Sequence, residues 1–168
     1  MGELLSELIK LLMIYLPAMV ANASPVFLKK GTPVDFGKLF IDGRRILGDG
    51  KTWEGLLLGL WFGGTVALSL WLLTSDLDYF VYGLVGSLGA LLGDMLFSFI
   101  KRRLGLERGA PLPLADQLDF FLGATALMMA LGWRPKMEYW IIAGVIIVGL
   151  HVTANRIAYM LKLKDVPW

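Results

Sequence analysis

Three aspartates stand in apolar surroundings where a charge is costly. Asp94 interrupts the otherwise uncharged run 79–100, and Asp116 and Asp119 lie three residues apart at the start of the run 114–133. A charge near the centre of a membrane span costs about 2.5–3.5 kcal/mol, so such acids usually face a polar cavity or a partner. Carboxylates without cysteine, and with a single histidine in the chain, suit Mg²⁺ rather than zinc. The sequence therefore predicts an acid-rich site within a membrane domain.

Basic side chains accompany these acids. Asp94, Ser98 and Lys101 are spaced i, i+4 and i+7, so a helix presents all three on one face. Arg102 and Arg103 follow directly. A metal ion and cationic side chains together neutralise the charge that gathers on phosphoryl oxygens. The combination of acids and bases therefore favours phosphate chemistry over a bare ion pathway.

A purely structural interpretation of the second acidic pair stays open. Asp116 and Asp119 would complement the dipole of a helix that begins near them, and each would pair with Arg102 or Arg103. The only histidine, His151, lies in a separate apolar run and is interpreted as a packed polar residue. Asp94, an acid within an apolar run, favours a functional polar site over a purely structural role for the acids.

The stretch GDGKT, residues 48–52, suggests an anion site. A phosphate-binding loop requires glycine five positions before Gly50, but that position is Arg45, so the nucleotide-loop motif is absent. Lys51 and Thr52 nevertheless stand at the start of an apolar helix, where free N–H groups and the helix dipole favour an anion. Alternatively, Thr52 only caps the helix and Lys51 is only an interfacial anchor.

Two other polar groups occur in the same connection. Asp42 and Arg44, on either side of Gly43, suit an ordinary turn with the arginine at lipid headgroups. Asn22 and Pro25 suit the end of the first helix. The first pair leaves a structural and a functional role equally open, whereas a structural role is the commoner reason for the second pair.

The elements that must position these residues are membrane helices. Of the 168 residues, 57% are hydrophobic and 18% are charged, and the mean hydropathy is +0.66, which is typical of a membrane protein. A formal charge of +2 gives no reason to expect nucleic acid as a partner. At about 20 residues per span, we expect an all-α integral membrane protein, a single domain over 1–168. Its five transmembrane helices are expected at about 4–21, 55–74, 79–100, 114–133 and 139–157, and loops 22–54 and 101–113 form the polar site.

The distribution of lysine and arginine predicts the orientation. Of the 16 such residues, all but Lys10, Arg134 and Lys136 lie in the two long loops, at the end of the fifth span or after it, Lys29 and Lys164 among them. Cytoplasmic loops carry the excess of basic residues. We therefore expect a multi-pass protein of the cell membrane whose amino terminus is outside and whose carboxyl terminus and polar site are cytoplasmic.

The pattern S-x-x-K-R, followed by a glycine, a proline-containing loop and D-x-x-D, resembles the signature of the phosphatidate cytidylyltransferase superfamily. The matching residues are Ser98, Lys101, Arg102, Pro111, Asp116 and Asp119. The stretches NASPVFLKKG, IDGRRILGDGKTWEG and LGDMLFSFIKRR resemble more closely its archaeal branch, the CDP-archaeol synthases, and the likeness covers nearly the whole chain. The segment PLPLADQLDF departs from the bacterial signature, because it lacks His-Gly-Gly and has Phe120 where an arginine often follows the last aspartate.

The resemblance implies that CTP is joined to an isoprenoid ether lipid phosphate, 2,3-di-O-geranylgeranylglycerol 1-phosphate, with release of pyrophosphate. It implies that Asp94, Asp116 and Asp119 hold Mg²⁺ on the CTP phosphates. It also implies that Lys51, Lys101 and Arg102 neutralise the triphosphate. The residues implied to shape the nucleotide pocket are Asn22, Pro25, Asp42, Gly43, Arg44, Thr52, Ser98 and Pro111.

Two alternative functions remain. A CDP-alcohol phosphatidyltransferase is also a small Mg²⁺-dependent membrane enzyme, but that family uses D-G-x-x-A-R followed by D-x-x-x-D, whereas this chain has Asp42-Gly43-Arg44-Arg45 and D-x-x-D. A small ion- or proton-coupled transporter would use Asp94 for its ion. Small transporters are commonly built from repeats, and none is evident in this sequence.

Overall fold

The computed structural model describes residues 2–28, 30–163 and 166, so Lys29 and Lys164 lie outside it. Its helices are α1 (Gly2–Ala23), a short 3₁₀ helix η1 (Ser24–Phe27), α2 (Trp53–Thr74), α3 (Leu77–Arg103), α4 (Ala115–Ala130) and α5 (Met137–Met160). Within the described ranges the only β pairing consists of two isolated antiparallel bridges. One joins Pro33 to Thr52, and the other joins Leu39 to Arg45. The expectation of an all-α fold is confirmed, but of the five expected transmembrane helices only four are, over the residues described, long enough to span a membrane, and the fifth, α4, is shorter.

Four of the helices are long and apolar enough to cross a membrane, namely α1 continued by η1, then α2, α3 and α5. The fifth helix, α4, has only 16 residues and rises about 24 Å, against a hydrocarbon core of about 30 Å. It ends early because Gly132 has a φ of +102°. The Gly132 N–H bonds to Met129 O, and the Trp133 N–H bonds to Met128 O, which closes the helix with a glycine cap. The expected span 114–133 is thus too long at its carboxyl end.

Two of the other helices extend further than the apolar runs predict. Since α1 reaches Ala23, Asn22 belongs to its last turn. Since α3 continues to Arg103, Lys101 and Arg102 are helical too, and they complement the negative end of the helix dipole. The loops therefore begin later than residues 22 and 101.

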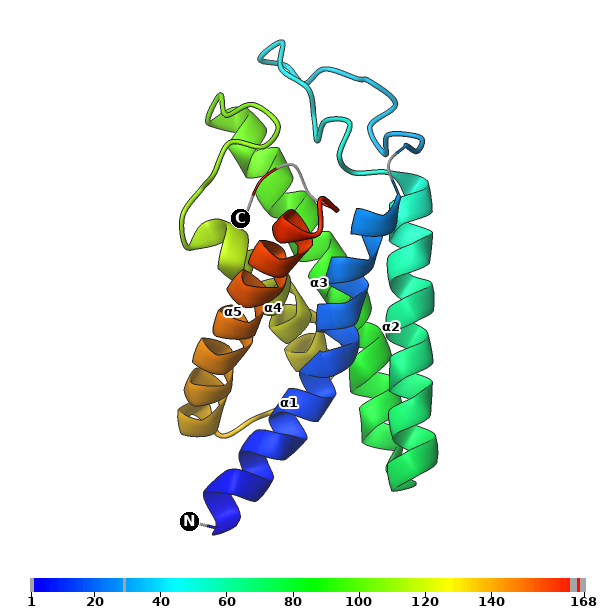
Figure 1. Ribbon diagram of the computed structural model, residues 1–168, viewed down its shortest axis with the longest axis vertical. Coiled ribbons are helices and arrows are strands. Elements are labelled where there is room, and N and C mark those ends of the chain that lie inside the picture. The colour runs from blue at the N-terminus through cyan, green and yellow to red at the C-terminus, as the bar shows by residue number, and fades with distance from the viewer. Residues whose placement is uncertain (1, 29, 164–165, 167–168) are drawn as a thin grey trace.

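Helix α3 runs through the middle of the bundle and packs against α1, α2 and α4 (Figure 1). Glycines permit its closest approach. A Cβ atom on Gly123 of α4 would overlap with Gly89 O and Gly93 Cα of α3, and one on Gly93 would overlap with Asp119 O. Small residues let membrane helices approach through their backbones. This crossing fixes the start of α4, and with it Asp119, against the middle of α3.

Polar groups also join α1, α4 and α5 inside the bundle. Tyr15 Oη lies 2.6 Å from Thr125 Oγ1, and Trp140 Nε1 donates to Tyr15 Oη at 2.9 Å. Tyr15 is fully buried and Thr125 nearly so. Because hydrocarbon offers no partners, polar groups within a membrane domain must satisfy one another. These bonds therefore hold α5 against the bundle.

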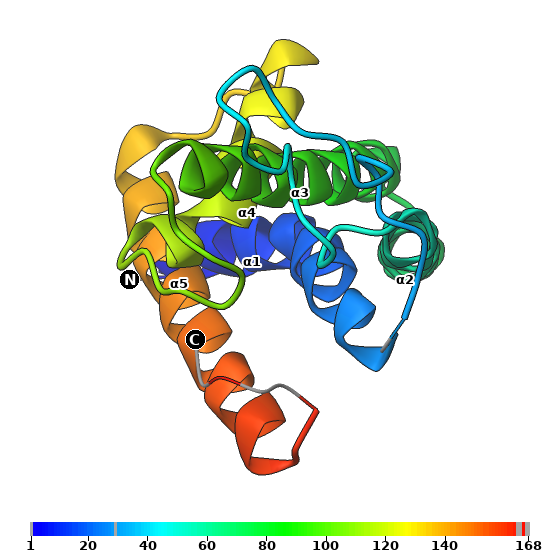
Figure 2. The ribbon, with the colours of Figure 1, turned by 90° about the horizontal axis from the view of Figure 1, so that it is seen from above.

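The loop 28–52 and the connection 104–114 lie at the same end of the bundle as the carboxyl end of α3, and the amino-terminal end of α1 lies at the opposite end (Figure 1). Viewed from above, the loop 28–52 extends over the end of α3 (Figure 2). The fold thus brings the two long connections of the chain to one end of the bundle.

Candidate functional site

Lys51, the last loop residue before the cap of α2, meets Asp94 of α3. Lys51 Nζ lies 2.5 Å from Asp94 Oδ2, and the two side chains are 22% and 28% exposed. Thr52 caps α2, because its Oγ1 accepts the Gly55 N–H at 3.1 Å. The capping interpretation of Thr52 is therefore confirmed, and the same turn directs Lys51 at the intramembrane acid instead of leaving it as an interfacial anchor.

Lys101 makes the second such pair, with Asp116 of α4. Lys101 Nζ donates to both carboxylate oxygens at 2.9 Å, and the side chains are 13% and 17% exposed. The Leu112 N–H also donates to Asp116 Oδ2 at 2.9 Å. Asp116 thus pairs with a basic residue of the α3 end, but the partner is Lys101 and neither of the arginines suggested by the sequence.

Asp119 completes the cluster from one turn further along α4. It is 6% exposed, and its Oδ1 accepts the Phe120 N–H at 2.5 Å. Its carboxylate interacts electrostatically with Asp94, Lys51 and Asp116. The structure therefore brings together residues from the loop, α3 and α4, and we call Lys51, Asp94, Lys101, Asp116 and Asp119 the acid–lysine cluster.

The cluster has the ligand chemistry of a Mg²⁺ site, since it contains three carboxylates. In the described part of the chain, however, no three acidic or histidine side chains are arranged to hold an ion directly. Asp94 and Asp116 each bind a lysine instead. The carboxylate oxygens suit a hard divalent ion once Lys51 and Lys101 no longer bind them. Phosphate oxygens would be suitable new partners for the two ammonium groups.

Two more predicted residues border the cluster on α3. Ser98 is half-buried one turn beyond Asp94. Arg102 Nε is buried and has no hydrogen-bond partner among the described residues. An unpaired buried donor costs roughly 1–3 kcal/mol. In the part of the chain that the structure describes, Arg103 Nε is buried and unpaired as well, so this feature belongs to the end of α3 and does not single out Arg102.

Asp35 organises the loop that carries Lys51, and sequence reasoning missed it. Its side chain is 1% exposed and accepts hydrogen bonds from Arg45 at 2.7 Å and from the N–H groups of Leu47 and Gly48 at 2.9 Å each. Burial alone would raise the pKa of this carboxyl, but the hydrogen bonds from Arg45 and from backbone N–H groups hold the pKa well below its usual range. The only sequence signal is a D-x-G turn pattern at Asp35.

The base of the loop is closed by Glu54. Its carboxylate accepts the Thr32 N–H at 2.7 Å and the Thr32 hydroxyl at 2.8 Å, and the Trp53 N–H donates to Thr32 O at 3.0 Å. Both ends of the loop are therefore held at the start of α2. Together with Asp35, these bonds fix where Lys51 leaves the loop.

Asp42, Gly43 and Arg44 lie at the far tip of this loop. Arg103 Nη1 donates to Asp42 Oδ1 at 2.5 Å, and Arg44 Nη1 donates to Arg103 O at 2.7 Å. Arg103 also lies over the Phe40 ring, with 4.7 Å between its Cζ atom and the ring centroid. Gly43 has a φ of +74°, which allows the tight turn. Asp42 and Arg44 thus dock the loop on the end of α3, through Arg103 and, for Arg44, also through Arg102 O.

The remaining predicted residues of the nucleotide pocket lie in the last turn of α1, in η1 and in the connection before α4. Pro25 lies beside Gly55 in the first turn of α2, and Asn22 is half-buried three residues earlier. Pro111 is exposed in the connection that leads into α4. His151 stacks on Phe120, with 4.7 Å between ring centroids, as expected for a packed polar residue.

Comparisons with known proteins show which family the chain resembles. A family model described as CarS-like, CDP-archaeol synthase, matches residues 4–168. A relative from Sulfolobus acidocaldarius named CDP-archaeol synthase is 51% identical over 159 residues, which is 94% of this chain and 96% of the relative. One of the same name from Hyperthermus butylicus is 48% identical over 169 residues, which covers both chains completely.

A solved structure described as an intramembrane enzyme for archaeal membrane lipids biosynthesis superposes on this chain with a TM-score of 0.83. It is 46% identical in sequence, and the alignment covers 88% of this chain and 94% of that one. The sequence and fold comparisons lead to the same assignment. The chain is a multi-pass membrane protein that belongs to the CDP-archaeol synthase family.

Proposed function

We propose that this chain is a cytidylyltransferase that joins CTP to an archaeal lipid phosphate, specifically 2,3-di-O-geranylgeranylglycerol 1-phosphate, and releases pyrophosphate. Membership of the CDP-archaeol synthase family supports the reaction class. The observation that carries the site is the acid–lysine cluster, in which Lys51 and Lys101 approach Asp94 and Asp116 inside a membrane domain.

The reaction needs charge neutralisation more than a nucleophile from the protein. An oxygen of the lipid phosphate attacks the α-phosphorus of CTP, the bond from that phosphorus to the bridging oxygen breaks, and pyrophosphate leaves. The attacking phosphate is already anionic at neutral pH, so positioning and electrostatics are the main demands. Lys51, Lys101 and Arg102 supply positive charge for the triphosphate. Ser98 and the Thr52 end of α2 border the same space.

A divalent cation is the expected cofactor of such an enzyme, and we infer that it is Mg²⁺. Asp94, Asp116 and Asp119 would hold it, because carboxylate oxygens are its preferred protein ligands. When bound there, the ion supplies charge stabilisation on phosphoryl oxygens. The loops that carry the basic residues are proposed to face the cytoplasm, where CTP is available.

The test is product analysis with CTP labelled at either end of its triphosphate. Purified protein is incubated with Mg²⁺ and the geranylgeranyl ether phosphate. Label at the α-phosphorus is expected in the lipid extract as a CDP-lipid, and label at the γ-phosphorus is expected in pyrophosphate. A folded protein that forms no CDP-lipid would exclude this function. A phosphatidyltransferase would instead consume CDP-lipid and release CMP, and a transporter would form neither product.

A further inference from the structure

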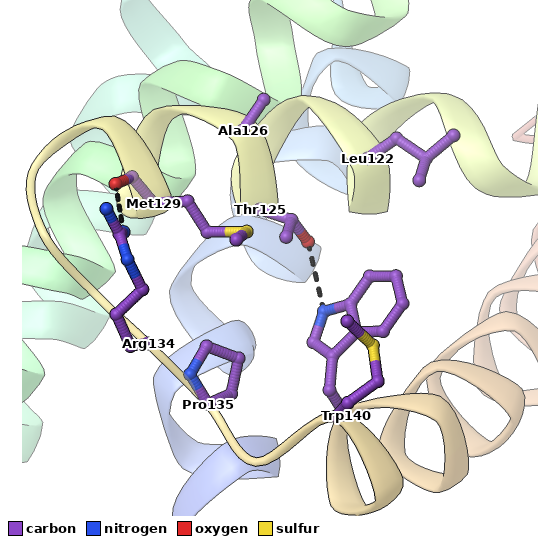
Figure 3. A pocket seen from close by; sticks show the side chains of 8 residues that line it. Leu122, Thr125, Ala126, Met129, Arg134, Pro135 and Trp140 are labelled. Atoms are coloured by element: carbon purple, nitrogen blue, oxygen red, sulfur yellow. Dashed lines mark hydrogen bonds between the residues drawn. The ribbon is translucent and has the colours of Figure 1, made fainter.

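An apolar cavity of about 280 Å³ lies between the end of α4 and the start of α5. Six of the side chains that line it are Leu122, Thr125, Ala126, Met129, Met137 and Trp140 (Figure 3). No member of the acid–lysine cluster lines this cavity. It is therefore a separate space at the other end of α4, to which no role has yet been given.

The polar groups around the cavity already have protein partners. Trp140 Nε1 and Thr125 Oγ1 both bond to Tyr15 Oη, and Arg134 Nη1 donates to the main-chain oxygens of Met129 and Trp133. A ligand here would be held by shape and dispersion more than by hydrogen bonds. The cavity thus suits a hydrocarbon chain.

A strip of α4 connects the cavity with the acid–lysine cluster. Asp119, Leu122, Ala126 and Met129 are spaced i, i+3, i+7 and i+10, so they follow one face of the helix. Leu122 and Met129 are 40% and 38% exposed. Ten residues of helix rise about 15 Å. An apolar track of that length therefore starts at the carboxylate and ends at the cavity.

The length of this track fits a lipid whose phosphate is drawn into the bundle. One leaflet offers about 15 Å of hydrocarbon, half of the core thickness. Asp94 lies seven residues, or about 10 Å, along α3 from Lys101, so a phosphate at the cluster sits deeper than a headgroup at the membrane surface. The lipid chains therefore extend past the midplane of the bilayer by about the same 10 Å. That depth corresponds to Met129.

We propose that the cavity receives the far end of an isoprenoid chain of the lipid phosphate, a subsite that rests on the proposed function. The flexible thioethers of Met129 and Met137 adapt well to a methyl-branched chain. Because the surrounding lipid is equally apolar, burial in the cavity supplies little hydrophobic driving force, and the gain comes from packing. The subsite therefore selects for chain length more than it raises overall affinity.

The test compares two lipid phosphates, one with two geranylgeranyl chains and one with two geranyl chains, which are too short to reach the far end of the cavity at Met129. Ala126→Phe fills the cavity. It is expected to lower kcat/KM for the long-chain substrate roughly tenfold, within the range for altered hydrophobic pockets. The KM for CTP and the kcat/KM for the short-chain substrate are expected to stay as in the wild type. Val145→Phe is the matched control, because Val145 is 70% exposed on α5 and does not line the cavity.

A loss confined to the long chain supports the subsite. Equal losses for both chain lengths, or no loss for either, would overturn it. Those results leave the proposed function intact, since the wild type still forms CDP-lipid. A wild type that forms no CDP-lipid from either substrate would instead refute the proposed function and the subsite with it.

A second measurement does not depend on turnover. A geranylgeranyl ether phosphate with a photoreactive group in its last isoprene unit is expected to label peptides from 122–140. The unlabelled lipid phosphate should compete for this labelling, whereas the same ether lipid without its phosphate should compete poorly, because it lacks the anchor at the acid–lysine cluster. Equal competition by both lipids would show that the cavity holds bulk lipid, and would overturn the proposal.

Discussion

Lys51 Nζ lies 2.5 Å from Asp94 Oδ2, although the two residues are 43 positions apart in the chain. The pair joins the end of the loop 28–52 to an acid within a membrane helix. Lys101 and Asp116 repeat the arrangement between α3 and α4. Each lysine therefore neutralises a carboxylate that the proposed function assigns to the metal, and we expect each to change partner when nucleotide and metal bind.

The first prediction concerns this exchange. Lys51→Met removes the ammonium that competes for Asp94, so Mn²⁺, used as a probe for Mg²⁺, should bind more tightly in the absence of nucleotide. The same variant loses a charge-assisted contact to phosphate, worth about 1.5–3 kcal/mol, so CTP should bind roughly tenfold or more weakly. Electron paramagnetic resonance measures the free Mn²⁺, and calorimetry measures CTP binding.

Lys38→Met is the control for this experiment, because Lys38 is an exposed residue of the same loop. It should change neither affinity. If Lys51 only supported the fold, Lys51→Met would weaken the binding of both ligands. That result would contradict the exchange.

The second prediction concerns Asp35. Asp35→Asn removes the negative charge and replaces one of the two acceptor oxygens with a donor, so either Arg45 or the two loop N–H groups lose their acceptor, which should lower the free energy of unfolding by about 1–3 kcal/mol. Because the loop delivers Lys51, the KM for CTP should also rise. Thermal unfolding and steady-state kinetics measure the two effects. Asp49→Asn is the matched control, since Asp49 also pairs with Arg45 but is 63% exposed, and it should change little.

The pKa of Asp35 gives this prediction a pH dependence. Hydrogen bonding outweighs burial and holds the pKa of the folded state below the ordinary value of 3.8. A depressed pKa stabilises the fold fully above the unfolded value, and the stabilisation declines as pH falls below it towards the folded pKa. The difference in Tm between the wild type and Asp35→Asn should therefore be constant near neutral pH and shrink below about pH 4. A difference that grew on acidification would contradict the assignment.

Much of the fold could be predicted from the sequence, because membrane helices are specified locally by apolar runs of sufficient length. The common face of Asp94, Ser98 and Lys101 also follows from helical spacing alone. The early end of α4 was not predicted, since Leu131 and Trp133 are apolar and the left-handed turn at Gly132 decides where the helix stops.

The contacts of the loop could not be predicted. The pairing of Lys51 with Asp94 and the role of Asp35 depend on how an irregular segment folds back on itself. Neither a spacing rule nor a charge pattern encodes such contacts. The docking role of Asp42 and Arg44 at the end of α3 was hidden for the same reason.

The third prediction concerns the crossing of α3 and α4. Gly123→Ala places a Cβ against Gly89 O and Gly93 Cα, so the helices must separate and Asp119 must move. The expected loss is about 1–3 kcal/mol of stability, typical of overpacking, with a larger loss of turnover. Gly149→Ala is the control, because a Cβ there meets nothing within 4 Å and alanine favours the helix by up to about 1 kcal/mol. Equal tolerance of both substitutions would contradict this view of the crossing.

The fourth prediction concerns orientation. The chain has no cysteine, so single cysteines can report sidedness directly. Lys38→Cys places a thiol in the loop 28–52, and Asp78→Cys places one at the opposite end, in the first turn of α3. In intact cells a membrane-impermeant maleimide should label the Asp78→Cys variant, and it should reach the Lys38→Cys variant only after lysis. The reverse pattern would place the loops outside.

The most direct test of the central claim is the rate of CDP-lipid formation by Asp94→Asn. If the acid–lysine cluster is the site of cytidylyl transfer, this rate should fall by on the order of a hundredfold or more, comparable with the loss of one charge-stabilising group in other active sites. Circular dichroism should show the helices intact, and Asp78→Asn, an exposed acid on the same helix, should retain normal turnover. A folded Asp94→Asn protein that forms CDP-lipid at nearly the wild-type rate would contradict the account.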